Sequence, residues 1–262
     1  SKLAPNILSI SGGGYGNVPI PLIKGNIPYH PINIPALGGA ISRFIDDSGG
    51  ISDKNDAESR VISVSGNSSM EELPIIPTTT TPVTTAWNHY VGFVGNIRPG
   101  LSRSKLLKDF SNALDHHKRQ SNMRLTLYSG KDWIHKISST MFNLAPRGFG
   151  RTSFRLAEII QIGRIPVYIY DDEPWLPYAG TYISFEQFGY VLGPKNNQDI
   201  ARALMLDGRN VTELRRKLLQ VKSVRHHYTY EGVLSQLEMF FSDPFGTNGG
   251  QLRCNRLPFR NH

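Results

Sequence analysis

The sequence predicts an α/β fold in which a parallel sheet carries helices on its faces. Strand-like runs alternate with helical runs from about residue 87 to residue 241, which is the pattern of βαβ units in a parallel sheet. Residues 141–178 contain a complete unit: an apolar strand, a Pro-Arg-Gly-Phe-Gly turn, a helix, and a β-rich run ending on two aspartates. Open α/β sheets bind phosphorylated ligands at such strand-to-helix junctions. The unit therefore predicts a site as well as a fold.

The elements before this unit follow from the spacing of apolar residues. Residues 90–94 are a predicted strand that ends in Gly-Asn. Residues 104–117 predict a helix, because apolar residues recur there every three or four positions. Residues 123–128 alternate like a strand, and residues 132–138 predict a short helix.

The helix within the unit has two distinct faces. An apolar stripe at spacing i, i+3, i+4, i+7 is expected to face the sheet; it consists of Leu156, Ile159, Ile160 and Gly163. A second face at matching spacing carries Arg151, Arg155, Glu158 and Ile162. The strand before the helix covers residues 142–144, and the strand after it covers residues 165–170. Further helices are predicted over residues 201–206, 211–219 and 232–241, followed by an extended tail.

The first 85 residues are irregular and rich in glycine and proline. Short strands are predicted at residues 7–10 and 61–64, and the low-complexity run TTTTPVTT at residues 78–85 reads as an extended linker. The sequence pattern changes near Trp87, where the alternating strand-like and helical runs begin.

Bulk composition limits the classes of partner. The net charge of +8 and the pI of about 9.6 favour anionic ligands. The basic residues are scattered, and no RNA-binding signature is present, so nucleic acid is not the expected partner. A single cysteine, Cys254, excludes a disulfide framework within the chain and a cysteine-rich zinc site. No apolar run approaches the ~20 residues of a membrane span. The chain starts on Ser1 rather than Met, so we expect a fragment.

The turn and the start of the helix predict a diphosphate site. Thr152 or Ser153 can cap the helix with a side-chain oxygen. The helix dipole, the first-turn N–H groups and the nearby arginines all favour negative charge. Glu158, about a turn and a half further along, could accept hydrogen bonds from ribose hydroxyls. The alternative is that Arg155 and Glu158 form an ordinary surface ion pair and the glycines only shape a turn.

The same segment resembles the sugar-nucleotide-binding half of the exostosin-type glycosyltransferases. The resemblance is specific over about residues 87–180, weaker to about 241, and faint over 1–85. The family's motifs appear here as Pro146-Arg147-Gly148, Ser153-Phe154-Arg155 with Glu158, Ile165-Pro166-Val167, Asp171-Asp172 and Leu176-Pro177-Tyr178, with Phe93-Val94-Gly95 and Ile20-Pro21 upstream. Asn143 departs from the small residue or cysteine that the family usually has before the turn, and we expect it to pack without consequence.

The resemblance implies a GT-B fold, made of two Rossmann-like domains with the donor held mainly by the C-terminal one. It divides the chain into a partial N-terminal, acceptor-side region with a linker (1–85), a donor-binding domain (86–241) and a tail (242–262). Glu158 would contact the ribose, Arg155 the UDP-sugar, and Ser153 the diphosphate. The full set of implied donor-binding residues is Arg98, Arg103, Arg147, Gly148, Gly150, Ser153, Arg155 and Glu158. No catalytic base and no metal ligand are assigned.

The implied activity is transfer of a sugar from a UDP-sugar to a hydroxyl of a glycan or glycoprotein acceptor, with inversion and without metal or other cofactor. The family location is the Golgi lumen, with a membrane anchor outside this chain, and homo- or hetero-oligomers are compatible with it. The alternative is a non-catalytic glycan-binding or scaffold protein that keeps the fold.

Three further motifs have competing interpretations. Asp171-Asp172 resembles a metal-binding acidic motif, but an acidic pair after a strand is more often a turn or a contact to a ligand hydroxyl. The pairs His116-His117 and His226-His227 are expected to be exposed helix residues rather than ligands, because neither has a partner at ligand spacing. Asn67-Ser-Ser and Asn210-Val-Thr fit the glycosylation acceptor pattern.

Overall fold

The computed structural model describes residues 10–11, 18–33, 37, 87–97, 102–117, 124–148, 150–178 and 183–242. The predicted strand at 61–64, the linker at 78–85, the domain boundary at 85/86, the tail after 242, and Arg98 lie outside these residues.

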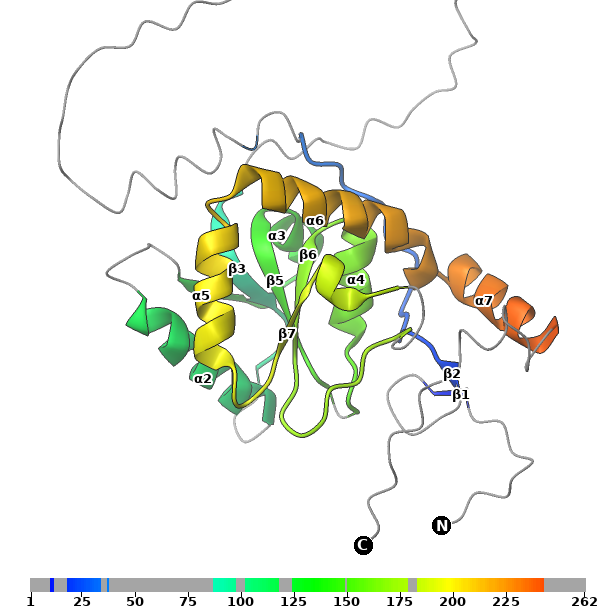
Figure 1. Cartoon of the computed structure of the whole chain (residues 1–262), viewed down its shortest axis with the longest axis horizontal. Coiled ribbons are helices and arrows are strands. Elements are labelled where there is room, and N and C mark those ends of the chain that lie inside the picture. Colours follow the sequence, from blue (N-terminus) through cyan, green and yellow to red (C-terminus); the bar gives the residue numbers. More distant parts are fainter. Residues whose placement is uncertain are drawn as a thin grey trace, which may run out of the picture.

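A single five-stranded parallel sheet forms the centre of the domain, which confirms the predicted α/β fold class. Its order is β4-β3-β5-β6-β7 (Figure 1). The strands are β3 (His89–Val94), β4 (Leu125–Tyr128), β5 (Thr140–Pro146), β6 (Ile165–Ile169) and β7 (Tyr190–Leu192). The chain moves outward from β3 to β4 and then crosses back to the other side of β3. The point where this order reverses, between β3 and β5, is where open α/β sheets place their ligands.

Helices cover both faces of the sheet, as predicted. The helices are α2 (Ser102–His116), α3 (Trp133–Ser138), α4 (Phe154–Ile162), α5 (Asn197–Asp207), α6 (Val211–Val224) and α7 (Tyr230–Ser242), with 3-10 turns η2 (Phe185–Gln187) and η3 (Arg225–Tyr228). One core cluster joins α2 and α5 to the sheet, and a second joins α3, α4 and η3 to its other face. Strand β7 and the two 3-10 turns were not predicted. A separate two-stranded ladder pairs β1 (Ile10–Ser11) with β2 (Val18–Pro19), so the strand expected at residues 7–10 is seen only from Ile10.

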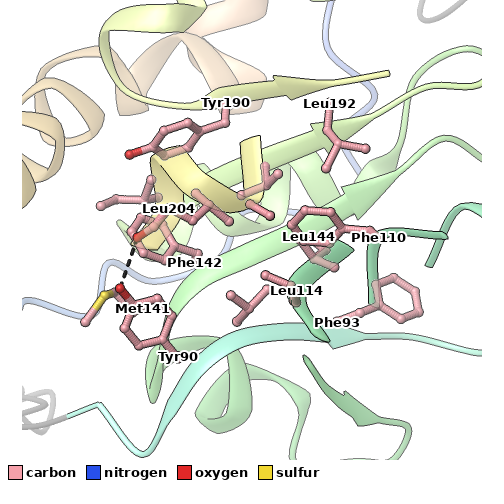
Figure 2. Close-up of a cluster of buried hydrophobic side chains, with 14 of the residues drawn as sticks. Tyr90, Phe93, Phe110, Leu114, Met141, Phe142, Leu144, Tyr190, Leu192 and Leu204 are labelled. Carbon is pink, nitrogen blue, oxygen red and sulfur yellow. Dashed lines mark hydrogen bonds between the residues drawn. The ribbon is translucent and has the colours of Figure 1, made fainter. Parts of the chain in front are cut away.

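The larger core cluster is built on aromatic residues from three strands of the sheet, β3, β5 and β7 (Figure 2). Phe142 on β5 is fully buried and lies 5.7 Å, centroid to centroid, from both Tyr90 and Tyr190. The hydroxyl of Tyr90 donates to the carbonyl of Leu204 over 3.0 Å, which ties α5 to the sheet. Aromatic contacts of this kind add to the stabilisation from apolar burial.

Helix α4 is buried almost all round, because other segments cover the face that the sheet does not. The predicted sheet-facing stripe is confirmed: Leu156, Ile159 and Ile160 are at most 1% exposed. The second face was expected to point away from the sheet, yet Ile162 on this face is fully buried and Glu158 is only 7% exposed. The interpretation of Arg155 and Glu158 as an ion pair therefore stands, but the expectation that this pair lies on the surface is wrong.

The covering segment is residues 18–33, here called the N-terminal strap. It follows α4, η3 and α7 (blue in Figure 1) and is held by side chains that reach its backbone. The amide oxygen of Gln161 accepts from the N–H of Ile27 over 2.6 Å, and Arg225 donates to the carbonyl of Ile27 over 3.0 Å. Fully buried Arg164 donates to the carbonyl of His30 over 2.7 Å. These contacts join the strap to the domain despite the long intervening sequence.

Gly163 closes α4 in a left-handed conformation and also makes room for the strap. Its φ is +88°, and a Cβ placed there would lie 2.2 Å from the ring of Tyr29. We predict that Gly163→Ala lowers the free energy of unfolding by about 1–3 kcal/mol, through backbone strain and this clash. Urea denaturation would measure it. Gly25→Ala is the control, because no atom lies within 4 Å of its added Cβ. Equal stability of the two variants would contradict the prediction.

The expectation that both histidine pairs are exposed is wrong for His227, and His117 is only half-exposed. His116 is exposed on α2, as predicted, but His227 in η3 is only 6% exposed and packs against Tyr178. Burial lowers the pKa of His227 to about 4, and the charge of His226 acts in the same direction. Sequence periodicity missed this because η3 lies between two helices and follows neither pattern. Within the described residues, no helix is long and apolar enough to cross a bilayer.

Candidate functional site

A cleft of about 630 Å³ opens at the carboxyl edge of the sheet, beside the point where the strand order reverses. Its walls come from the ends of β3 and β4, from α3 and α4, and from the strap. The lining residues are Lys24, Gly25, Ile27, Val94, Gly95, Asn96, Ser129, Gly130, Trp133, Arg155 and Glu158. Its size falls within the range of small-molecule sites.

Arg155 and Glu158 form the charged centre of this cleft. Nη1 of Arg155 lies 2.8 Å from Oε2 of Glu158, in an ion pair whose N–H direction does not complete a hydrogen bond. The Arg155 guanidinium also stacks 4.9 Å from the ring centroid of Trp133. Burial raises the pKa of Glu158, while the charges of Arg155 and Lys24 oppose the rise. Because this ion pair is buried and its hydrogen bond is incomplete, the remaining donors of Arg155 and acceptors of Glu158 are available to bind a ligand.

Two further cations flank the pair and give the site a positive field. Lys24, on the strap, lines the cleft and is near enough to lower the pKa of Glu158. Arg103, on α2, donates to the carbonyl of Asn96 over 3.3 Å, and its Nε is buried without a hydrogen-bond partner among the described residues. Burial lowers the pKa of Arg155, and Arg103 lowers it further. The cleft and its immediate surroundings thus hold three positive groups and one carboxylate, so the cleft suits an anionic ligand.

The glycine turn and the N-cap of α4 connect β5 to Arg155, which lines the cleft. Ser153 is the N-cap, and its Oγ accepts from the N–H of Arg155 over 3.2 Å. The cap is therefore Ser153 rather than Thr152. The N–H of Gly148 donates to the carbonyl of Thr152 over 3.1 Å, which closes the turn. A Cβ on Gly148 would lie 3.8 Å from Nη2 of Arg103, so the turn and Arg103 are neighbours.

Arg147 and the acidic pair after β6 bind each other instead of lining the cleft. Nη1 of Arg147 lies 2.5 Å from Asp171 and 2.9 Å from Asp172. Arg147 Nε also donates to the carbonyl of Gly150 over 3.2 Å. Arg151 extends the network to Asp172 at 3.3 Å and to Glu173 at 3.0 Å. Both aspartates lie in the bend after β6, in agreement with the turn interpretation, and both are engaged with arginines.

The structure accordingly gathers part of the predicted site. Arg155 and Glu158 line the cleft; Arg103, Gly148 and Ser153 lie beside it. Arg147 and Gly150 belong to the neighbouring ion-pair network. The cleft is also lined by residues that were not predicted from the sequence: Lys24, Trp133 and the Ser129-Gly130 turn. The last two follow β4, so the rule that ligands gather at strand carboxyl ends could have found them.

Comparison with known proteins gives only distant structural matches. No protein-family model and no curated protein matches the chain. Among solved structures, TarM matches at 10% identity with a TM-score of 0.40, over 58% of this chain and 35% of that one. HepE of Anabaena, solved with UDP-glucose, matches at 12% identity and a TM-score of 0.39, over 59% and 49%. Sucrose-phosphate synthase of Thermosynechococcus elongatus matches at 13% and 0.39, over 59% and 38%. The matched region thus spans less than half the length of each of these proteins.

Proposed function

We propose that this protein is a glycosyltransferase whose described domain binds the nucleotide of a UDP-sugar. The observation that carries the proposal is the buried Arg155–Glu158 pair, set in a cationic cleft at the reversal point of a parallel sheet. In this proposal Glu158 accepts from ribose hydroxyls. Arg155, Arg103 and Lys24 lie around the diphosphate, and the Ser129-Gly130 backbone and the Trp133 ring border the base.

The chemistry proposed is transfer of the sugar to a glycan hydroxyl, by the inverting and metal-independent route that the exostosin resemblance implies. Departure of UDP leaves negative charge on its terminal phosphate. Fixed cations and the first-turn N–H groups of α4 would stabilise that charge without reorganisation, in the manner of an oxyanion site. A luminal Golgi location and a glycan or glycoprotein acceptor complete the proposal.

Titration calorimetry with UDP tests the donor site directly. We expect binding of UDP that does not depend on added Mg²⁺, with uridine alone binding more weakly because it lacks the diphosphate. No binding by a folded sample would reject the donor-site assignment. Binding that requires Mg²⁺ would favour a metal site instead.

We predict that Glu158→Gln weakens UDP binding by about 1–3 kcal/mol, the magnitude of lost hydrogen bonds to a charged group. The 2′-deoxy analogue of UDP makes the test specific. If Glu158 holds the ribose, the analogue binds wild type more weakly than UDP does, and the variant no longer distinguishes the two. Glu238→Gln, at an exposed position on α7, is the control and should bind like wild type. A variant that still discriminates the analogue would leave Glu158 with only its ion-pair role.

A non-catalytic glycan-binding protein is the second candidate. One observation favours it: among the described residues that line the cleft, the only carboxylate is Glu158, which is already paired with Arg155. UDP release from a UDP-sugar panel, with oligosaccharide acceptors present, separates the two candidates. Turnover supports the enzyme, whereas glycan binding without turnover supports the scaffold.

A further inference from the structure

The glycosylation triplet Asn210-Val211-Thr212 lies at an exposed corner of the domain, where α5 ends and α6 begins. Asn210 and Thr212 are both exposed, and Val211 between them is 39% exposed. Such a triplet is an acceptor for N-glycosylation when it lies on the surface of an extracellular or luminal protein. The other triplet, at Asn67, lies outside the described residues. We propose that Asn210 is an N-glycosylation site; this rests on the luminal location within the proposed function.

The two polar atoms of the Asn210 side chain have separate tasks, which makes modification compatible with the fold. Oδ1 caps α6: it accepts from the N–H of Thr212 over 3.1 Å and from the N–H of Glu213 over 3.2 Å. Nδ2 makes no hydrogen bond within the described residues and belongs to an exposed side chain. An N-linked sugar is carried on Nδ2 and leaves Oδ1 as a carbonyl oxygen. The helix therefore keeps its cap after modification.

The surface around Asn210 is one that a glycan would cover usefully. Leu206 is 55% exposed and Val211 is 39% exposed, and both lie within four residues of Asn210. The apolar face of a sugar ring can pack on such side chains, and the polar rim of the glycan then faces water. The glycan would thus hide apolar surface that the described residues leave open.

The position also keeps a glycan away from the candidate nucleotide cleft. The end of α5 lies at the amino edge of the sheet, since Asp207 accepts from the hydroxyl of Tyr190, the first residue of β7, over 2.5 Å. The cleft lies at the carboxyl edge, beyond the ends of β3 and β4. In Figure 1 the corner between α5 and α6 lies at one end of the domain, and the start of α5 lies at the other end. Donor binding and the modification would therefore be independent.

The reaction proposed is the ordinary transfer from a polyisoprenyl-diphosphate oligosaccharide. The Nδ2–C1 bond forms, and the bond between C1 and the diphosphate oxygen breaks. The amide nitrogen gives one proton to a base of the transferase, and the polyisoprenyl diphosphate leaves with the bonding electrons.

The test is to express the full chain behind a cleavable signal peptide in eukaryotic secretory cells. The glycans are then removed by peptide N-glycosidase in heavy-oxygen water, which converts each glycosylated asparagine to labelled aspartate. We expect label at position 210 in the wild type and in Thr212→Ser, which keeps the triplet. We expect complete loss of label there in Thr212→Ala, with label at Asn67 scored separately by its own peptide.

Unlabelled Asn210 in the folded wild-type chain, whether secreted or retained, would overturn the inference. UDP titration of the same sample keeps this separate from the proposed function. UDP binding by a chain without glycan at Asn210 rejects the modification alone. A glycosylated chain that does not bind UDP rejects the donor site alone.

Discussion

Replacing Arg164 by methionine is expected to lower the free energy of unfolding by about 3 kcal/mol. The side chain is fully buried, and it holds carbonyl groups from three separate places in the fold. It donates to Ser138 over 2.8 Å, to His30 over 2.7 Å and to Gly163 over 3.1 Å. Each carbonyl left without its donor costs about 1–3 kcal/mol.

The charge on Arg164 opposes part of this loss. Burial lowers the pKa of Arg164 to about 10, although Tyr29 partly offsets it. A shift from 12.5 to about 10 corresponds to about 3 kcal/mol of unfavourable burial of the charged form. Methionine removes that penalty together with the hydrogen bonds. The net estimate of about 3 kcal/mol is the orphaned carbonyls less this relief.

Urea denaturation of Arg164→Met against Arg215→Met tests the prediction. Arg215 is exposed on α6, so its loss should change stability by no more than about 0.5 kcal/mol. Because Arg164 holds the strap at His30, and the strap carries Lys24, the variant should also be cut faster within residues 18–33 by a nonspecific protease and bind UDP more weakly. Equal unfolding curves for the two variants would mean that water replaces the lost donors.

The fold could be predicted from sequence wherever an element is long and periodic. Leu106, Phe110 and Leu114 repeat at helical spacing on α2, and all three are buried as that spacing requires. Strand β7 has only three residues, too few for alternation to be recognised, and it was missed. The strap was missed for another reason. Its extended backbone is fixed by Gln161, Arg164 and Arg225, which no local pattern connects to it.

The candidate site was predicted in part for similar reasons. Arg155 and Glu158 could be placed together because helical spacing fixes i, i+3 neighbours. Arg147 was assigned to the ligand, although it pairs with Asp171. The register explains this pairing: Pro146 lies opposite Ile169, so the residues just beyond the two strand ends meet. The 24-residue separation hid the contact, but the parallel arrangement of two adjacent strands implies it. Lys24 could not be found, since its place in the cleft depends on the strap.

A second large effect is expected in mild acid, where the domain should lose stability through His227. The folded pKa is about 4, against 6.5 for an exposed histidine, because burial and the charge of His226 both disfavour the protonated ring. The unfolded chain therefore binds more protons between these values. The free energy of unfolding falls as the pH drops from about 6.5 to about 4, by up to about 3 kcal/mol in all.

The geometry around His227 supports the direction of this shift. Nδ1 lies 3.0 Å from Nε2 of Gln236, an amide nitrogen that can only donate, so Nδ1 accepts and carries no proton. The hydroxyl of Tyr178 donates to the backbone carbonyl of His227 over 2.5 Å, and the Tyr178 ring packs against the imidazole edge to face. A proton on Nδ1 would break the Gln236 contact and bury a charge beside His226.

Urea denaturation at several pH values, comparing wild type with His227→Asn and His116→Asn, measures this contribution. Asparagine at position 227 keeps a polar group that does not titrate, so its stability should fall less between pH 6.5 and 4 than that of wild type. The exposed His116 variant should follow wild type, because that side chain is not buried on folding. Since His227 lies in η3 beside Arg225, which holds the strap at Ile27, loss of η3 in acid should also open the cleft. The UDP affinity of the wild type is then expected to fall over the same pH range. The UDP affinity of His227→Asn should fall less. Equal losses of affinity in both proteins would show that another group causes the acid sensitivity.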